Sequence, residues 1–265
     1  LQVLSLLRVL HLTDPHLFAD PQGALRGAVT YDSLQAVLAH YRDSGWQADI
    51  AVVTGDLVQD DSAGAYTHFR ESLAPLGMPV YCLPGNHDVP ALMRDALSEE
   101  PFHYCRPVER AGWLIAYVDS CVPGIAGGAI SNREYERLEQ LIAASEAEHV
   151  MVCLHHPPVA MNSKWLDTVG LKDGEEFVRR LGIAGKVRLA VFGHVHQEYD
   201  ADHNGMRIIA TPSTCRQFAK GSEDFAVDDN PPAYRRITLK DNGDFDTELV
   251  WIDTERYMDQ SGASE

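Results

Sequence analysis

The sequence predicts an α/β protein built as an α+β sandwich, in which two mixed β-sheets pack face to face with flanking helices. Short apolar runs alternate with helical patterns through residues 1–192, which is typical of strands covered on both faces. After residue 192 the helical patterns stop, and apolar runs separated by turn residues predict antiparallel hairpins. With 265 residues, 45% of them apolar, the chain is long enough to bury a sizeable core.

The first half of the chain predicts three strand-and-helix units. We interpret residues 1–12 as the first strand and not as a signal peptide, because the run contains Arg8 and lacks a small-residue cleavage site. Apolar residues at helical spacing predict a first helix around 34–41, which Thr30 or Asp32 could cap. The other expected strands lie at 50–53 and 80–83, and the other expected helices lie at 66–73 and 91–97.

The second half of the chain predicts a repeat of this pattern followed by hairpins. Strands are expected at 113–118, 150–154 and 189–192, with helices at 135–142 and 177–181. Three last strands, at 206–210, 234–239 and 245–250, are separated by turns rich in Asn, Asp and Gly. We therefore expect a single domain over residues 1–253, and a disordered tail over the small and polar residues 254–265.

Charge and cysteine content limit the partners of the protein. The net charge of −17 argues against binding to a nucleic acid polymer, and no apolar stretch approaches the length needed to span a membrane. A small anionic substrate remains compatible with this charge, because bound metal ions dominate the local field. Five cysteines without a C-x-x-C spacing, two of them inside apolar runs, predict a reduced cytoplasmic compartment. The sequence specifies no oligomeric state.

Five of the apolar runs end in residue types that bind metal ions. We interpret these five ends as one site at the carboxyl ends of the strands. The five are Asp14-Pro15-His16, Gly55-Asp56, Gly85-Asn86-His87-Asp88, His155-His156 and Gly193-His194-Val195-His196.

The composition of these five ends indicates the chemistry. Carboxylate, amide and imidazole ligands without thiolate favour Mn, Fe, Zn, Co or Ni.

The spacing of the ligands indicates how they are arranged. In an extended segment, residues two apart point the same way, so we expect Asp14 and His16 to form one pair of ligands and His194 and His196 another. Pro15 would keep Asp14 extended. The set exceeds what one ion needs and fits two ions that share a bridge, which is the arrangement used for displacement at phosphorus. The sequence therefore predicts a phosphoester hydrolase.

The order of these motifs resembles the calcineurin-like metallophosphoesterases, and the similarity runs from about Val9 to Trp251. Further stretches are similar to one branch of that family, the bacterial class III cyclic-nucleotide phosphodiesterases of the cyclic AMP phosphodiesterase type. These stretches are 14–19, 54–60, 163–167 and 210–215. The resemblance implies the metallophosphoesterase fold.

The resemblance also implies a role for each ligand. Asp14, His16 and His196 would hold one metal ion, while Asn86, His155 and His194 would hold the other, with Asp56 as the bridge. His155 is preferred over His156 because the family pattern places the ligand two residues before the first proline, here Pro157. The ions would be divalent or trivalent, with iron and manganese expected first and zinc, cobalt and nickel as alternatives. The other seven histidines, His11 among them, are expected to be structural.

The implied reaction is hydrolysis of 3',5'-cyclic AMP to 5'-AMP by a metal-bridging hydroxide. His87 would act as the catalytic residue beside Asp56, because it binds no metal in the family and faces the phosphate. Candidate substrate contacts are Asn86, His87 and Trp165, whose indole could stack on a nucleobase or merely pack within its loop. Alternatives are a broader phosphodiesterase, acting on 2',3'-cyclic nucleotides or glycerophosphodiesters, and a non-catalytic metal-binding scaffold.

Overall fold

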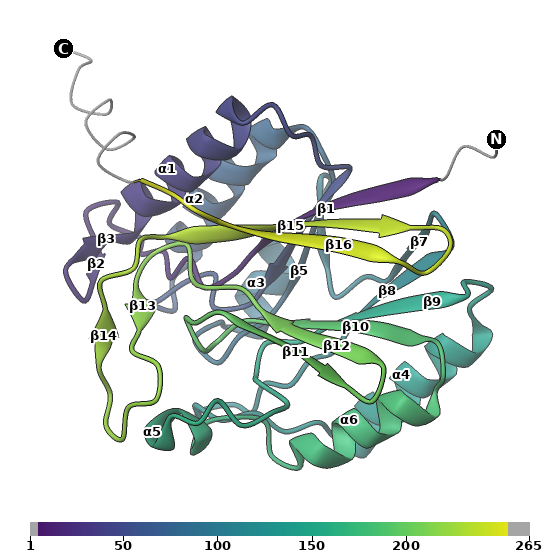
Figure 1. Cartoon of the computed structure of the whole chain (residues 1–265). Coiled ribbons are helices and arrows are strands. Elements are labelled where there is room, and N and C mark those ends of the chain that lie inside the picture. The colour runs from purple at the N-terminus through teal and green to yellow at the C-terminus, as the bar shows by residue number, and fades with distance from the viewer. Residues whose placement is uncertain (1–4, 254–265) are drawn as a thin grey trace.

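The computed structural model describes residues 5–253, which form four layers in the order helix, sheet, sheet, helix (Figure 1). The first sheet has the strand order β16-β15-β1-β4-β5-β6, and the second has the order β11-β12-β10-β9-β8-β7. Each sheet combines parallel and antiparallel neighbours, which confirms the predicted pair of mixed sheets. The tail expected over 254–265 lies outside the described residues.

The first sheet has a parallel half and an antiparallel half. Its strands are β1 (Leu6–Leu12), β4 (Ile50–Thr54), β5 (Val80–Leu83), β6 (Phe102–Tyr104), β15 (Ala233–Lys240) and β16 (Phe245–Trp251). Alternation along β1 covers both faces, because Leu10 and Leu12 pack against the helices while Leu7 and Val9 pack against the other sheet. This two-sided burial explains why the strands appear in the sequence as continuous apolar runs.

The second sheet repeats this construction around a parallel centre. Its strands are β7 (Val108–Arg110), β8 (Trp113–Tyr117), β9 (His149–Cys153), β10 (Val187–Phe192), β11 (Tyr199–His203) and β12 (Met206–Ala210). The two edge strands, β7 and β11, were not predicted. Both are antiparallel to their neighbours and carry no residue that is buried, so they lack the apolar run that marks the inner strands.

The helices cover the outer faces of the sheets (Figure 1). On the first sheet lie α1 (Thr30–Asp43), α2 (Ala63–Leu73) and α3 (Pro90–Ala96), and on the second lie α4 (Asn132–Ala144) and α6 (Gly174–Ile183). Two shorter helical elements are η1 (Ala74–Leu76) and α5 (Lys164–Asp167). The prediction that Thr30 or Asp32 caps α1 is wrong: Val29 is the N-cap residue, and it makes no side-chain capping bond. No helix among residues 5–253 is long and apolar enough to cross a membrane.

Two small hairpins lie outside the main sheets. The first pairs β2 (Ala24–Leu25) with β3 (Ala28–Val29), and the second pairs β13 (Gln217–Phe218) with β14 (Val227–Asp228). Residues of both hairpins line the same pocket as the predicted metal ligands. They therefore belong to the surroundings of the site and not to the core.

Candidate metal centre

The predicted ligands follow five parallel strands, namely β1, β4 and β5 of the first sheet and β9 and β10 of the second. Parallel strands end at one edge of a sheet, so their loops converge there. The contact between the first two loops is direct, because the Asp14 N–H donates to the Gly55 carbonyl at 3.1 Å and the His16 N–H donates to the Asp56 carbonyl at 3.0 Å. The structure thus brings together residues that lie up to 180 positions apart.

The first group of ligands consists of Asp14, His16 and His196. The Nε2 atoms of His16 and His196 are 3.0 Å apart. The Oδ1 atom of Asp14 lies 3.4 Å from Nε2 of His196 and 3.8 Å from Nε2 of His16. All three side chains are buried, so three ligand atoms face one another at a point that bulk water barely reaches.

The second group consists of Asn86, His155 and His194. The Asn86 Oδ1 atom is 3.1 Å from Nε2 of His155 and 2.9 Å from Nδ1 of His194, and the two nitrogens are 3.2 Å apart. Asp56 lies between the two groups, because its Oδ2 atom is 3.6 Å from Nε2 of His16 and 3.4 Å from Nε2 of His155. One carboxylate oxygen therefore faces both groups, as the bridging role predicted for Asp56 requires.

Hydrogen bonds behind the histidines show that the site fits metal ions. Nδ1 of His155 is 2.7 Å from the Thr54 carbonyl, and Nδ1 of His196 is 2.5 Å from the Arg216 carbonyl. A carbonyl only accepts, so these nitrogens carry the proton, and in the neutral rings the Nε2 lone pairs point into the clusters. For His155 that lone pair faces the oxygens of Asn86 and Asp56, an arrangement that a cation stabilises. Histidine ligands of metals commonly donate their other N–H in this way.

The pKa values of these side chains are consistent with a site that binds metal ions. Burial lowers the pKa of His194 to about 3 and that of His16 to about 4, so both rings are neutral at pH 7. Burial opposes ionisation of Asp56, but the charge of His155 and its hydrogen bond to the carboxylate hold the pKa of Asp56 well below the usual range. Burial also disfavours the charged form of His155, yet the Asp56 carboxylate raises the pKa of that imidazole to about 9. Metal binding would displace this proton.

The backbone at the ligands corrects one prediction. The Asp14-His16 and His194-His196 pairs are not extended: φ is +52° at Asp14, +47° at His16, +66° at His194 and +47° at His196. Asp56, with φ of +50°, shares this left-handed conformation, which costs roughly 1–3 kcal/mol for a residue other than glycine. Two left-handed residues in each pair aim the side chains inward, and the clustering of such residues is typical of functional sites.

Glycines in the motifs allow the loops to approach this closely. A Cβ atom on Gly85 would overlap the Asp56 carboxylate, and one on Gly193 would overlap the Thr13 hydroxyl and lie 2.6 Å from Oδ2 of Asp14. Asp88 then joins two of the loops, because its carboxylate accepts from the N–H groups of Leu57 and Gly85. It also accepts from the Tyr66 hydroxyl at 2.9 Å, so it positions the loop that carries Asp56.

His87 lies beside the ligands but outside both groups. Its ring is 5.1 Å from the ring of His16, in an edge-on arrangement. The side-chain amide of Gln59 donates to Nδ1 of His87 at 3.2 Å, which leaves Nε2 as the protonated nitrogen of the neutral ring. Gln59 is a site residue that the sequence reasoning missed, since an amide in a polar loop carries no signal of its own. The ring nitrogens of His156 contact the Ser120 hydroxyl and the Ala126 carbonyl, although His156 also lies close enough to His155 and His194 to share an ion with them.

The two groups open into a pocket of about 260 Å³ with an aromatic wall. Trp165, predicted as a stacking residue, lines this pocket, but its indole N–H donates to Ser222 and its ring packs edge-on against Phe218 and Phe225. Phe218 also stacks on His196, with ring centroids 4.0 Å apart. The exposed guanidinium of Arg26 lies 4.7 Å from the centre of the Phe225 ring. The two phenylalanines were missed because they lie in a hairpin remote from every motif.

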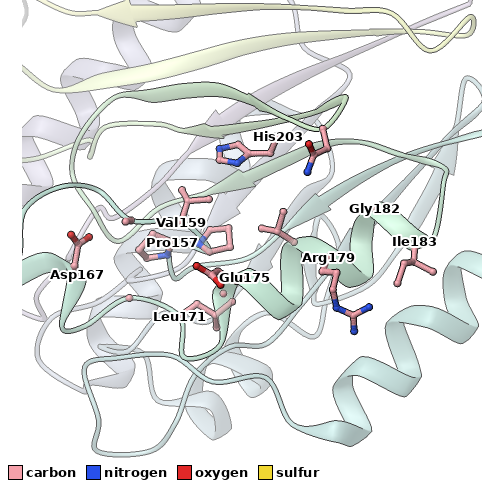
Figure 2. Close-up of a pocket in the computed structure, with 15 residues that line it drawn as sticks. Pro157, Val159, Asp167, Leu171, Glu175, Arg179, Gly182, Ile183 and His203 are labelled. Atoms are coloured by element: carbon pink, nitrogen blue, oxygen red, sulfur yellow. The ribbon is translucent and has the colours of Figure 1, made fainter.

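A larger groove is lined by the segment that begins two residues after His155, at Pro157, and by α6 (Figure 2). It has a volume of about 790 Å³ and contains none of the predicted ligands. Figure 2 shows Pro157 and Leu171 along it, with Arg179 and Ile183 projecting from α6. Its lining is mostly apolar, and it therefore lacks the converging donors of the smaller pocket.

Comparisons with known proteins agree with this geometry. The chain is 38% identical over 255 residues to the 3',5'-cyclic adenosine monophosphate phosphodiesterase CpdA of Escherichia coli K12, covering 95% of this chain and 92% of the relative. It is also 38% identical to the protein of the same name from Vibrio vulnificus, covering 92% and 89%. The Haemophilus influenzae protein of that name is 33% identical, over 93% and 90% of the two chains.

Solved structures support the fold and no more than the fold. A dimetal phosphatase from Danio rerio has a TM-score of 0.63 at 11% identity, over 94% of this chain and all of that one. PhoD has a TM-score of 0.60 at 9% identity, over 95% of this chain and 70% of that one. Residues 7–198, which include every predicted metal ligand, match the family described as calcineurin-like phosphoesterase. The chain therefore belongs to the calcineurin-like phosphoesterases, which use a dinuclear metal centre.

Proposed function

We propose that this protein hydrolyses 3',5'-cyclic AMP to 5'-AMP at a two-metal site. The observation that carries the proposal is the single Asp56 oxygen that faces both ligand groups at the base of a small pocket with an aromatic wall. The pocket volume of about 260 Å³ lies close to the lower end, about 300 Å³, of the range for small-molecule sites, so it suits one small ligand and not a polymer. The relatives named as cyclic AMP phosphodiesterases cover about nine-tenths of this chain and support the same substrate.

The ligand assignment follows the two groups in the structure. Asp14, His16 and His196 would hold one ion, Asn86, His155 and His194 the other, and Asp56 would bridge them. When bound, two transition-metal ions supply Lewis acidity toward the phosphoryl oxygens and lower the pKa of water. Iron or manganese is proposed, and zinc, cobalt or nickel would suit the same oxygen and imidazole donors.

His87 is the proposed catalytic residue of the chain itself. Gln59 occupies Nδ1 of His87, so the proton of the ring is held on Nε2. A proton donor in this pocket can stabilise charge on the phosphoryl oxygens and protonate the departing 3'-oxygen of the ribose. Breaking the bond to the 3'-oxygen leaves the phosphate on the 5'-oxygen, which gives 5'-AMP. Asn86 is a second proposed contact of the phosphate.

The aromatic wall is proposed to hold the nucleobase. Trp165, Phe218 and Phe225 form one packed cluster at the mouth of the ligand groups, and Trp165 is held in place by Ser222. Stacking on aromatic rings contributes about 1–3 kcal/mol per base and tolerates any base. We therefore expect a preference for cyclic purine nucleotides with some hydrolysis of the others.

A substrate panel tests the proposal. The protein, loaded with Mn²⁺, is given 3',5'-cyclic AMP, 2',3'-cyclic AMP, a glycerophosphodiester and bis-nitrophenyl phosphate, and the products are separated by chromatography. We expect 5'-AMP from the first compound as the fastest natural reaction. Turnover of the glycerophosphodiester without hydrolysis of cyclic AMP would establish the broader phosphodiesterase instead. Absence of turnover on all four would identify a metal-binding scaffold.

Cellular location is a separate proposal. All five cysteines are free, including the buried Cys82, Cys153 and Cys215. Proteins of oxidising compartments commonly pair their cysteines, so this state supports a reducing cytoplasm. Cell fractionation of the native host tests it, and recovery of the activity in a periplasmic fraction would contradict it.

A further inference from the structure

A line of buried polar side chains crosses the space between the two sheets and ends at Asp14. Thr13 contacts Oδ2 of Asp14 at 2.6 Å, and the hydroxyls of Thr54 and Thr13 are 2.8 Å apart. Nε2 of His11 is 2.9 Å from the Thr54 hydroxyl. The rest of the line runs from Nδ1 of His11 to the Thr211 hydroxyl at 2.7 Å and from there to Nε of Arg235 at 3.3 Å.

The direction of these bonds can be assigned from the Asp14 end. The Thr13 hydroxyl donates to Oδ2 of Asp14 at 2.6 Å, and the same oxygen accepts the His194 N–H at 3.0 Å, so Oδ2 is the acceptor at the end of the line. Since that contact uses the proton of Thr13, the Thr54 hydroxyl must donate to Thr13. Thr54 can then only accept from His11, which places the proton of His11 on Nε2.

The same assignment continues to the other end. Burial and the charge of Arg235 lower the pKa of His11 to about 3, so the ring is neutral and Nδ1 accepts from the Thr211 hydroxyl. Thr211 in turn accepts from Nε of Arg235. Every donor in the line thus points from the guanidinium toward the carboxylate. Bonds that share one direction polarise and strengthen one another in a buried setting.

Arg235 is an unusual member of this core. Its side chain is almost fully buried, and among residues 5–253 it makes no ion pair with a carboxylate. Its other donors go to the Ala210 carbonyl at 2.9 Å and the Thr247 hydroxyl at 2.7 Å. Burying a charge without a counterion is unfavourable for folding, and apolar residues of similar volume often serve stability better. Stability alone therefore does not account for this line of side chains.

The line leaves Asp14 in one orientation. Its Oδ2 atom is held by the Thr13 hydroxyl and by the His194 N–H at 3.0 Å. Its Oδ1 atom is the one that lies 3.4 Å from Nε2 of His196 and 3.8 Å from Nε2 of His16. The second group of ligands meets the line only through backbone groups, namely the His194 N–H on Asp14 and the Thr54 carbonyl beside Nδ1 of His155, and no side-chain hydroxyl of the line bonds to its ligand atoms.

We infer that Arg235, Thr211 and His11 are positioning residues that act through Thr54 and Thr13 to fix Asp14 as a ligand of one metal ion and not of the other. The inference rests on the proposed two-metal site but not on the identity of the substrate. It predicts a selective effect. Loss of the Thr211 hydroxyl, which lies on the other side of His11 from the carboxylate, should lower the affinity for the ion bound by Asp14 and leave the affinity for the ion bound by Asn86 unchanged.

Titration of the metal-free protein with Mn²⁺ tests the inference without any turnover. Thr211→Val removes one hydroxyl at nearly constant volume, and we expect it to weaken one of the two binding steps by roughly 10- to 100-fold, as for other residues that support a metal ligand. Asp14→Asn identifies which of the two Mn²⁺-binding steps depends on Asp14, because that step is the one this substitution weakens. Thr211→Ser restores a hydroxyl and should restore the affinity.

Thr214→Val is the matched control. Thr214 is buried near Thr211, but its hydroxyl has no hydrogen-bond partner among the described residues, so its removal should leave both steps unchanged. Unchanged affinity in folded Thr211→Val, equal weakening of both steps, or no recovery in Thr211→Ser would overturn the inference. An equal effect of Thr214→Val would do the same.

A measurement on the unmodified chain covers the case in which Thr211→Val fails to fold. Nitrogen NMR of the metal-free protein reports which nitrogen of His11 carries the proton, and His11→Gln identifies its signals. We expect Nε2 protonated and Nδ1 bare. A proton on Nδ1 would make Nε2 an acceptor from the Thr54 hydroxyl, which could then no longer donate to Thr13, so the line would be broken between His11 and Asp14 and the inference would be overturned. If the protein does not hydrolyse cyclic AMP, the proposed function fails, but the Mn²⁺ titration and the NMR measurement still test this inference.

Discussion

The smaller pocket and the larger groove differ in the state of their polar groups. In the smaller pocket, carboxylate, amide and imidazole atoms face one another, and Nδ1 of His16 and Nε2 of His194, the other nitrogens of two of these rings, have no hydrogen-bond partner among residues 5–253. In the larger groove, Arg179 is paired with Glu176 and His203 accepts from or donates to Tyr199 at 2.8 Å. The chemistry therefore lies in the cavity with unsatisfied, convergent donors, and volume is a poor guide to it.

Asp56→Asn is expected to have the largest effect, because it changes the one side chain that faces both ligand groups. An amide keeps the shape but loses the charge, so both ions should be lost together. Activity should then fall by more than the roughly 10²- to 10⁴-fold that a proton donor contributes. Elemental analysis after Mn²⁺ reconstitution and an assay with cyclic AMP measure both quantities. Retention of one ion would show that Asp56 is a ligand of the other ion only.

His87→Ala separates chemistry from metal binding inside the same pocket. The ring lies outside both ligand groups, so metal content should stay at the wild-type level while hydrolysis of cyclic AMP slows by roughly 10²- to 10⁴-fold. The loss should be smaller for bis-nitrophenyl phosphate, whose leaving group needs no proton. A variant that loses metal would place His87 among the ligands. Gln59→Ala, which removes only the partner of Nδ1, should show a weaker form of the same effect.

Trp165→Ala tests the wall of the pocket, where a smaller effect is expected. Removing one stacking ring should weaken cyclic AMP hydrolysis by about 5- to 150-fold, which corresponds to about 1–3 kcal/mol. Hydrolysis of bis-nitrophenyl phosphate should barely change, since that compound carries no nucleobase. Steady-state kinetics on the two compounds give the comparison, with Trp46→Ala, which follows α1 and does not line the pocket, as a control for loss of an aromatic ring. An equal loss on both compounds would assign Trp165 a structural role.

A substitution in the larger groove should have the smallest effect. Ile183 is 71% exposed at the end of α6, and Ile183→Ser should leave the activity within about 2-fold of wild type and the free energy of unfolding within about 0.5 kcal/mol. Urea unfolding and the cyclic AMP assay measure the two values. A tenfold change in activity with unchanged stability would show that the groove is coupled to the metal site through the loop that both cavities share.

Fold and ligands were predictable from the sequence where burial or motif spacing leaves a local mark. Residues 50–53 and 80–83 were recognised because those strands are covered on both faces and consist of apolar residues throughout. Six of the seven predicted ligands lie in the two groups seen in the structure and Asp56 lies between them, because each is in the loop that follows such a strand. The edge strands β7 and β11 escaped prediction because they carry no buried residue and polar residues are tolerated there, whereas β16, also at an edge, was predicted at 245–250.

Conformation within the motifs was less predictable. Pro15 biases Asp14 toward extended backbone, and that bias led to a wrong expectation for the pair with His16. Contacts from the neighbouring loop, including the bonds from Asp14 and His16 to the loop after β4, stabilise the left-handed conformation that local propensity disfavours. Tertiary hydrogen bonds can exceed a local preference of a few kcal/mol, and short-range reasoning contains no information about them.

The sequence by itself determined the alternation of strands and helices, the ligand types and their order along the chain, since each depends on residues that are neighbours in sequence. Only the tertiary structure decided that one Asp56 oxygen faces two groups, that Phe218 and Phe225 wall the pocket, and that Arg235 connects to Asp14 through His11. These relations join residues that lie from tens to hundreds of positions apart in the sequence. Strand pairing and the packing of the two sheets bring them together, and neither the composition nor the spacing of a single segment encodes that geometry.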